Sequence, residues 1–139
     1  MVRVVIVGAS GRMGRTLVSC ARQMQGIVVA GAVDRADSPS IGRDVGELAG
    51  IGALGIPVTT DLAAALRAGA DVVIDFSDPA STAGNLAAAA AAGVAALGGT
   101  TGLPPDIEPH AAQAATRVPV LIASNTSLGV TLLTALVRE

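Results

Sequence analysis

Three glycines near the N-terminus, Gly8, Gly11 and Gly14, have the spacing GxxGxxG. The first would let the chain turn sharply off a strand, and the second would let backbone N–H groups approach an anion without a Cβ in the way. The third would let the following helix pack close to the sheet. Because a helix N-terminus carries free N–H groups and a partial positive charge, this pattern predicts a pyrophosphate site. The alternative is a glycine-rich turn without a ligand.

An acidic residue follows at an informative distance. Asp34 lies 20 residues after Gly14, at the end of the apolar run 27–33. In dinucleotide-binding folds an acid at this separation accepts a hydrogen bond from the adenosine ribose, which favours NADH. The adjacent Arg35 can bind the 2′-phosphate of NADPH. We therefore predict a site that uses both cofactors; otherwise the two residues simply begin a solvated loop.

Polar or glycine-rich segments also follow later apolar runs. Asp75 interrupts the run 70–76 near its end and is interpreted as a carboxylate that orients the next loop. Residues 98–102, GGTTG, can place donors beside a bound ring or carbonyl, and the polar segment 123–127 follows the run 118–122. The carboxyl ends of parallel strands meet at one edge of a sheet, so these segments should converge on one ligand site.

The elements that position these residues alternate along the chain. Apolar, β-branched runs predict strands, and apolar residues at helical spacing predict helices between them. This order is typical of an α/β fold, here a Rossmann-like doubly wound parallel sheet in a single domain. Residues 36–57 show no sustained periodicity and are predicted to form a mobile surface loop. The predicted strands span 2–7, 27–33, 58–59, 70–76, 94–97 and 118–122, and the predicted helices span 12–24, 62–68, 80–92, 104–115 and 128–138.

Composition excludes several other classes. The 139 residues suit one domain, and a net charge of −2 without any basic run argues against nucleic acid as a partner. The alanine-rich stretch 86–97 is too short to cross a membrane, and the N-terminus lacks the pattern of a signal peptide. We expect a cytoplasmic protein.

The one cysteine and the one histidine are assigned no chemistry. Cys20 lies in a helical pattern and is expected to be a buried or half-buried packing residue. His110 follows two prolines in an alanine-rich helix and is expected to face solvent or to pack. With so few such ligands, no metal site is predicted.

Five motifs together carry a family resemblance: VVIVGASGRMGR at 4–15, DVGELAG at 44–50, VVIDFS at 72–77, GGTTG at 98–102 and SNTSLGV at 124–130. With them the sequence resembles the N-terminal half of the dihydrodipicolinate reductases, NAD(P)H-dependent enzymes of diaminopimelate and lysine biosynthesis. The resemblance covers nearly the whole chain. It departs from the family pattern at Thr126, where a bulkier apolar residue is usual, and at Thr131, which is often asparagine.

The resemblance implies a set of cofactor-binding residues. Those near the phosphates would be Gly8, Ala9, Ser10, Gly11, Arg12 and Met13, and those at the adenosine ribose and any 2′-phosphate would be Asp34 and Arg35. The nicotinamide end would be bordered by Phe76, Gly99, Thr100, Thr101, Ala123, Ser124, Asn125 and Thr126, with Thr101 also near the substrate. No catalytic residue is assigned within residues 1–139.

The resemblance also implies a second, catalytic domain with a His-His pair, a lysine and a Gly-Thr substrate loop. These 139 residues contain one histidine and no lysine, so we expect a dinucleotide-binding domain that orients nicotinamide for hydride transfer but does not turn over alone. Its substrate, a small cyclic imine or enamine dicarboxylate, would bind only with that other domain. Two alternatives stay open: a stand-alone cofactor-sensing or interaction module, whose last helix packs on another subunit as in a homo-oligomer, and the Rossmann half of another amino-acid dehydrogenase.

Overall fold

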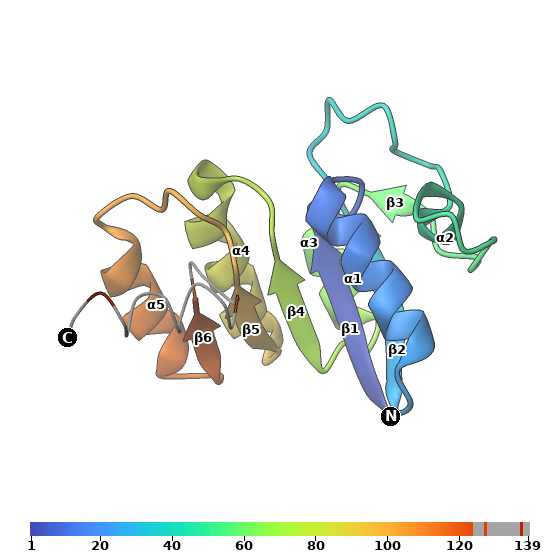
Figure 1. The fold of residues 1–139 in the computed structure, drawn as a ribbon. Coiled ribbons are helices and arrows are strands. Elements are labelled where there is room, and N and C mark those ends of the chain that lie inside the picture. Colours follow the sequence, from blue (N-terminus) through green and yellow to red (C-terminus); the bar gives the residue numbers. More distant parts are fainter. Residues whose placement is uncertain (124–126, 128–136, 138–139) are drawn as a thin grey trace.

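A computed structural model describes residues 1–123, 127 and 137. Its centre is a six-stranded parallel sheet in the order β3-β2-β1-β4-β5-β6 (Figure 1). The strands are β1 Val2–Val7, β2 Ile27–Val33, β3 Val58–Thr59, β4 Val72–Asp75, β5 Ala95–Gly98 and β6 Val120–Ile122. The helices are α1 Arg12–Gln23, α2 Val45–Leu48, α3 Leu62–Arg67, α4 Pro79–Ala92 and α5 Ile107–Ala115. The predicted doubly wound α/β fold is confirmed.

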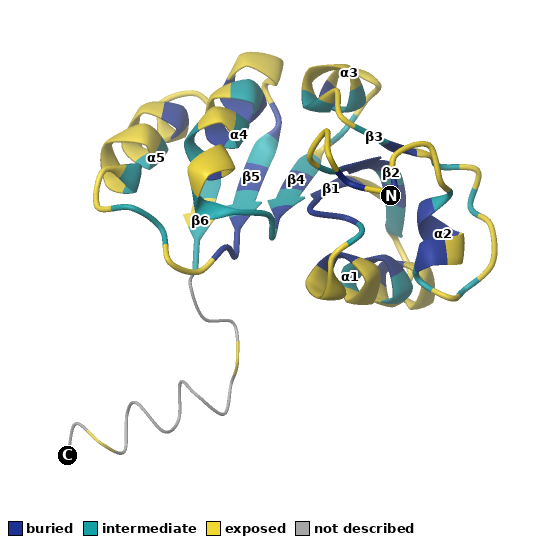
Figure 2. Cartoon of the chain, turned by 90° about the horizontal axis from the view of Figure 1, so that it is seen from above, coloured by how far each residue is buried: buried dark blue, intermediate teal, exposed yellow. Residues whose placement is uncertain are grey.

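The helices form layers on both faces of the sheet, with α1 and α2 on one face and α3, α4 and α5 on the other (Figure 2). Strand β1 contributes side chains to the core on both faces of the sheet, because successive residues of a strand point to opposite faces. Val5 and Val7 belong to the core beneath α3 and α4, whereas Val4 and Ile6 belong to the core beneath α1. Such burial on both faces explains the nearly continuous apolar run of this strand.

The helices on the α4 face begin and end at capping residues that are typical of helix termini. Asp61 caps α3, and Asp78 caps α4 ahead of Pro79 in its first turn. Gly93 ends α4 in the left-handed conformation, with φ of 70°. Helix α5 begins later than the two prolines suggested, at Ile107, because a turn precedes it.

The prediction of a mobile surface loop over 36–57 missed a short helix. The segment contains α2, whose Val45 is fully buried in the core beneath α1. The Asp44 carboxylate holds it together by accepting backbone N–H bonds of 2.8–3.1 Å from Gly46, Glu47, Leu54 and Ile56. The bond from Leu54 is the main cause that lowers the pKa of Asp44 to about 2.

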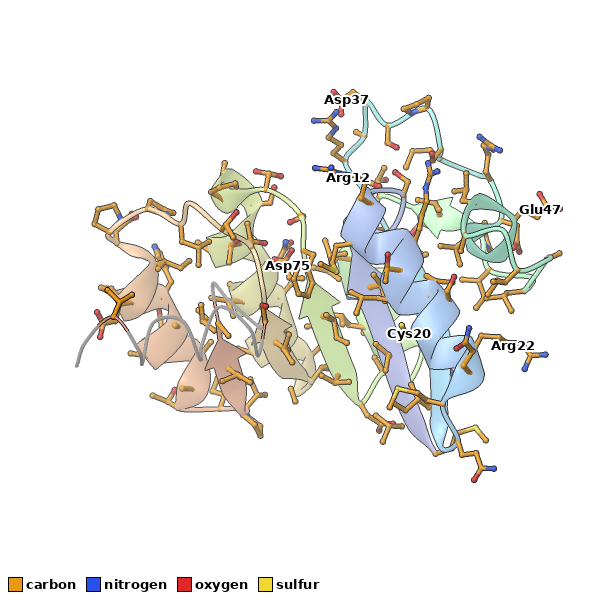
Figure 3. All side chains as sticks on the ribbon, in the orientation of Figure 1. Arg12, Cys20, Arg22, Asp37, Glu47 and Asp75 are labelled. Atoms are coloured by element: carbon orange, nitrogen blue, oxygen red, sulfur yellow. The ribbon has the colours of Figure 1, made fainter. Side chains whose placement is uncertain are left out.

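Two further expectations about α1 need correction. Its buried side is formed by Gly14, Val18 and Ala21, and Cys20 lies off that side and is exposed. Figure 3 labels Cys20 on this helix. The apolar residues at helical spacing that predict this helix include Met13 and Met24, but these two side chains are 45% and 56% exposed.

The predicted helix 128–138 lies almost wholly outside the described residues. Within the described part of the chain, no helix has both the length and the apolar character that crossing a bilayer requires.

Candidate functional site

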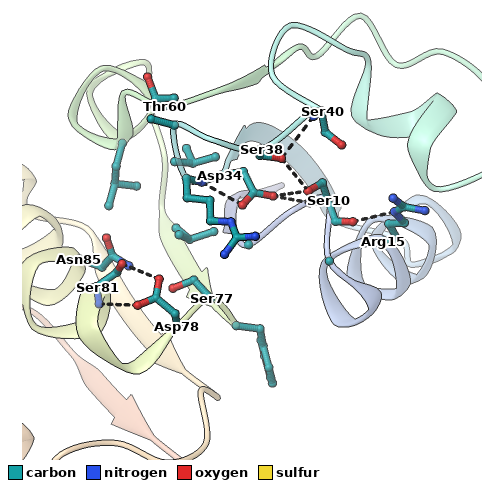
Figure 4. Close-up of a pocket in the computed structure, with 18 of the residues that line it drawn as sticks. Ser10, Arg15, Asp34, Ser38, Ser40, Thr60, Ser77, Asp78, Ser81 and Asn85 are labelled. Carbon is teal, nitrogen blue, oxygen red and sulfur yellow. Dashed lines mark hydrogen bonds between the residues drawn. The ribbon is translucent and has the colours of Figure 1, made fainter.

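Two hollows of about 610 and 700 Å³ lie at the carboxyl edge of the sheet and share Phe76 and Ser77. The first hollow lies among the loops that follow β1, β2 and β4, and Figure 4 shows it in close-up. The second lies between the start of α1 and the loops that follow β5 and β6. Together they form a groove along the edge where doubly wound sheets bind ligands.

The glycine turn between β1 and α1 depends on missing side chains. Gly8 has φ of +75°, and a Cβ there would lie 2.6 Å from the Phe76 carbonyl oxygen. A Cβ on Gly14 would lie 2.2 Å from the Gly8 carbonyl oxygen. Gly14 therefore brings α1 against the glycine turn itself, rather than against a strand as the sequence suggested. Gly11 is less confined, since its Cβ would meet the Gly8 oxygen at 3.2 Å.

The N-terminus of α1 faces this groove without a cap of its own. Its N-cap residue is Gly11, no side chain of the described residues caps it, and its first turn contains no acid. The Arg15 Nε donates to the Ser10 carbonyl oxygen at 2.8 Å and braces the turn. The first backbone N–H groups of α1 and its partial positive charge are thus free of an internal anion.

Asp34, at the end of β2, is tied to the glycine turn. Its Oδ2 accepts hydrogen bonds from the Ser10 amide, at 3.0 Å, and from the Ser10 hydroxyl, and its Oδ1 accepts from the Arg35 amide at 2.9 Å (Figure 4). The Arg35 guanidinium forms a 3.1 Å ion pair with Asp37, and both side chains are more than 70% exposed. This arrangement places the Asp34 carboxylate and the exposed Arg35 guanidinium on neighbouring residues, at the end of the groove where the sequence predicts the ribose.

Two serines that the sequence analysis did not select complete this end of the groove. Ser38 and Ser40 are buried, and the Ser38 hydroxyl oxygen lies 3.3 Å from that of Ser10. The Ser40 amide donates to the Ser38 hydroxyl oxygen at 3.3 Å. They were missed because they belong to the segment predicted as a mobile surface loop.

The loop after β4 separates the two hollows. Buried Asp75 accepts bonds from the Ser77 amide, the Ser77 hydroxyl and the Asn85 side-chain amide at 2.6–2.9 Å. It therefore orients the loop, as its position in the sequence indicated. Asp78 accepts from the Ser81 hydroxyl, and mainly for that reason its pKa is lowered.

The second hollow contains the residues predicted for the nicotinamide end. Phe76 lies against Gly99 so closely that a Cβ there would come within 2.1 Å of the ring. Thr100 is buried and its hydroxyl points back toward the Asp75 carbonyl oxygen at 3.4 Å. Thr101 is exposed, and it lines the hollow together with Arg12, Met13, Thr100 and Ala123.

The structure thus brings most of the predicted residues to one groove. Ala9 is the exception among the described ones: it is fully buried, its amide donates to the Val33 carbonyl oxygen, and it lines neither hollow. Ser124, Asn125 and Thr126 lie outside the described residues. Polar residues of the first hollow that were not selected are Arg15, Ser38, Ser40, Thr60, Ser77, Asp78, Ser81 and Asn85, and Thr16 is a further one in the second hollow. For Thr60, Ser77 and Asp78 the signal in the sequence was a hydroxyl or carboxylate soon after a strand.

The remaining titratable groups that the structure describes form no second candidate site at this edge of the sheet. His110 is exposed on α5 and lines a separate cavity of about 160 Å³ between α4 and α5. Among residues 1–123, 127 and 137, no three His, Cys, Asp or Glu side chains gather as metal ligands would.

Comparison with known proteins shows which family the chain belongs to. A family profile described as "Dihydrodipicolinate reductase, N-terminus" matches residues 2–126. The 4-hydroxy-tetrahydrodipicolinate reductase of Anaeromyxobacter dehalogenans is 50% identical over 139 residues, which are 100% of this chain and 51% of that protein. The corresponding enzyme of Halorhodospira halophila is 48% identical over 96% of this chain and 50% of its own length.

Solved structures agree on the fold. A dipicolinate-bound dihydrodipicolinate reductase from a Paenisporosarcina species has a TM-score of 0.71 at 22% identity, and the match covers 95% of this chain and 50% of that one. The GenD2 protein of gentamicin A biosynthesis, solved in complex with NAD, has a TM-score of 0.66 at 27% identity over 89% of this chain and 34% of its own. The chain spans about half the length of the curated relatives it matches. It belongs to the dihydrodipicolinate reductase family and corresponds to the N-terminal part of that family's proteins.

Proposed function

We propose that the groove binds NADH or NADPH, with the adenosine end in the 610 Å³ hollow and the nicotinamide end in the 700 Å³ hollow. The observation that carries the proposal is that the two hollows adjoin at Phe76 and Ser77, which line both of them, beside the uncapped N-terminus of α1. A pyrophosphate at that N-terminus would have one nucleoside on each side. This is how the edge of a doubly wound sheet accommodates a dinucleotide.

Each part of the bound cofactor has residues of suitable chemistry. The amides from Gly11 to Met13 would hold the pyrophosphate, Asp34 would accept from the adenosine ribose, and Arg35 would reach a 2′-phosphate. Phe76 and the segment 99–101 would flank the nicotinamide ring. Gly8 and Gly14 fit this role because their missing Cβ atoms let the backbone form the cradle.

The reaction we propose is that of the family: reduction of a cyclic imine or enamine dicarboxylate in the biosynthesis of diaminopimelate and lysine. The bound nicotinamide would supply the hydride, while these residues would bind and orient it. The solved relative bound to dipicolinate is consistent with a cyclic dicarboxylate as substrate. We propose that residues 1–139 act as the dinucleotide-binding domain, and that the proton donor and the substrate-binding lysine come from outside them, since they contain no lysine and one histidine.

Calorimetric titration of the 139-residue chain with NADH and with NADPH tests the proposal. We expect saturable binding of both, one nucleotide per chain, and no turnover of the dihydrodipicolinate-type substrate. Absence of binding for both nucleotides would overturn the proposed function. Robust turnover by the chain would instead contradict the proposed division of labour.

The use of both cofactors has its own test. Arg35→Ala should weaken NADPH binding more than NADH binding, because in this proposal the guanidinium meets the 2′-phosphate, which NADH lacks. Arg43→Ala provides the matched control, since Arg43 is an exposed arginine that does not line the hollow. Equal losses for the two cofactors in Arg35→Ala would contradict the assigned role.

A further inference from the structure

The Asp34 carboxylate is already heavily used by the protein's own donors. Its Oδ2 accepts both the amide and the hydroxyl of Ser10, and its Oδ1 accepts the amide of Arg35. A carboxylate offers about four lone-pair sites, two on each oxygen. Three of them are therefore engaged, and a single site on Oδ1 remains.

This occupancy matters for a nucleotide that presents a ribose. The two adjacent hydroxyls of an unmodified ribose can donate to both oxygens of a carboxylate, but here Oδ2 is saturated. A ribose that carries a 2′-phosphate has only the 3′-hydroxyl to donate. The occupied Oδ2 therefore costs NADPH less binding free energy than it costs NADH. Of the two Ser10 bonds, the amide bond persists whatever the side chain is, so only the hydroxyl bond depends on residue type.

The neighbouring Ser38 holds the Ser10 hydroxyl in this arrangement. The two hydroxyl oxygens lie 3.3 Å apart, and Ser38 is only 9% exposed. Because the one hydroxyl hydrogen of Ser10 points to Asp34, Ser38 is the donor between the two serines. Ser38 thus makes it harder for Ser10 to turn away when a ribose arrives.

We propose that Ser10 is a specificity-determining residue whose hydroxyl, by occupying Asp34 Oδ2, weakens the binding of NADH relative to that of NADPH. The inference rests on the proposed function, since it assumes that the ribose of a dinucleotide meets Asp34. It adds that the balance between the two cofactors is set at the glycine turn as well as at Arg35.

The test is the dissociation constant of each cofactor for Ser10→Ala, measured by calorimetry at one fixed ionic strength. This change frees an acceptor site on the Asp34 carboxylate and should tighten NADH binding by about three- to tenfold. NADPH binding should stay unchanged or weaken, because the less neutralised carboxylate repels the 2′-phosphate. Ser19→Ala is the control: it removes a serine hydroxyl from α1 that lines neither hollow and that donates to the Ala49 carbonyl oxygen instead of Asp34.

A second variant shows whether the effect passes through Asp34. In an Asp34→Asn background, Ser10→Ala should no longer change the ratio of the NADH and NADPH dissociation constants. A ratio unchanged by Ser10→Ala in the wild-type background, or a weaker binding of NADH, would overturn the inference while leaving the proposed function intact. If the wild-type chain binds neither cofactor, the proposed function fails and the inference fails with it. Thermal unfolding without cofactor verifies that each variant is folded.

Discussion

Two helix N-termini, those of α1 and α4, border the same groove but begin in opposite ways. Helix α4 carries its own anion: the Asp78 carboxylate accepts bonds from the amides of Ala80 and Ser81. Helix α1 starts at Gly11 with no side-chain cap and no acid in its first turn. Since every helix start needs acceptors for its free N–H groups, α4 meets that need internally and α1 leaves it to a ligand.

The difference shows how one sheet edge can be selective about where it binds phosphate. The partial positive charge is similar at both helix starts, so the charge alone does not choose between them. The choice comes from the side chains: a self-capped start at α4 and a glycine turn at α1. The glycines of the α1 turn allow close backbone approach, and no side chain of the described residues caps the first amides of the helix.

The largest effect is expected on the free energy of unfolding when one methyl group is added to α1. The same addition to α4 is the comparison. Gly14→Ala would place a Cβ 2.2 Å from the Gly8 carbonyl oxygen, so the backbone must shift, at a cost of about 3 kcal/mol in the free energy of unfolding. Gly84→Ala in α4 meets nothing within 4 Å and should stabilise by about 0.5–1 kcal/mol. Chemical denaturation measures both. Equal effects of the two changes would contradict the account of the cradle.

The next effect tests what happens when α1 is given a cap like that of α4. Gly11 has φ of −71° and ψ of 172°, which any residue can adopt. Gly11→Asp should cap α1. Because its charge faces the pyrophosphate, it should also weaken the binding of both cofactors roughly 100-fold. Gly11→Asn, which caps without a charge, should weaken them much less. Titrations in which Asp and Asn give the same loss would show that size rather than charge matters.

A smaller effect is expected when the α4 cap is removed. Asp78→Ala should destabilise the fold by about 1 kcal/mol, because the Ala80 and Ser81 amides lose their acceptor. Asp106→Ala is the matched control, since Asp106 stands at the N-cap of α5 but makes no capping bond there. Its free energy of unfolding should be nearly unchanged. If both variants lose the same stability, the hydrogen bonds at α4 are not the cause.

The last prediction concerns stability in acid. The folded-state pKa of Asp44, about 2, lies below its ordinary value of 3.8, and the pKa of Asp78 is lowered as well. Their contribution is therefore complete above about pH 4 and is lost as the pH falls toward 2. Asp44→Asn should flatten the fall in unfolding free energy across that window. An unchanged pH profile would contradict the role given to the Asp44 carboxylate.

Much of the framework could be predicted because local pattern decides it. The runs that form β1 and β2 are apolar and bounded by turn residues, and their bounds were predicted residue for residue. The caps of α3 and α4 are likewise local signals, readable from Asp61 and from the Asp78-Pro79 pair.

The segment 36–57 could not be predicted in this way. Its helix α2 has only four residues, too short to show periodicity, and it depends on bonds from Leu54 and Ile56 to Asp44 across the segment. Ser38 and Ser40 reach the groove only because that segment folds back on itself. Cys20 shows a second limit of prediction from sequence patterns. The spacing predicted the helix, but it did not reveal that Cys20 lies off the buried side of α1.

The central claim is that α1, and not α4, receives the pyrophosphate. Amide chemical shifts of the ¹⁵N-labelled chain during a titration with NADH test it most directly. The account predicts that the largest changes fall on Gly11, Arg12 and Met13, with smaller ones at Ala80 and Ser81, whose amides stay bonded to Asp78. Changes that are equal at the two helix starts, or larger at α4, would contradict it.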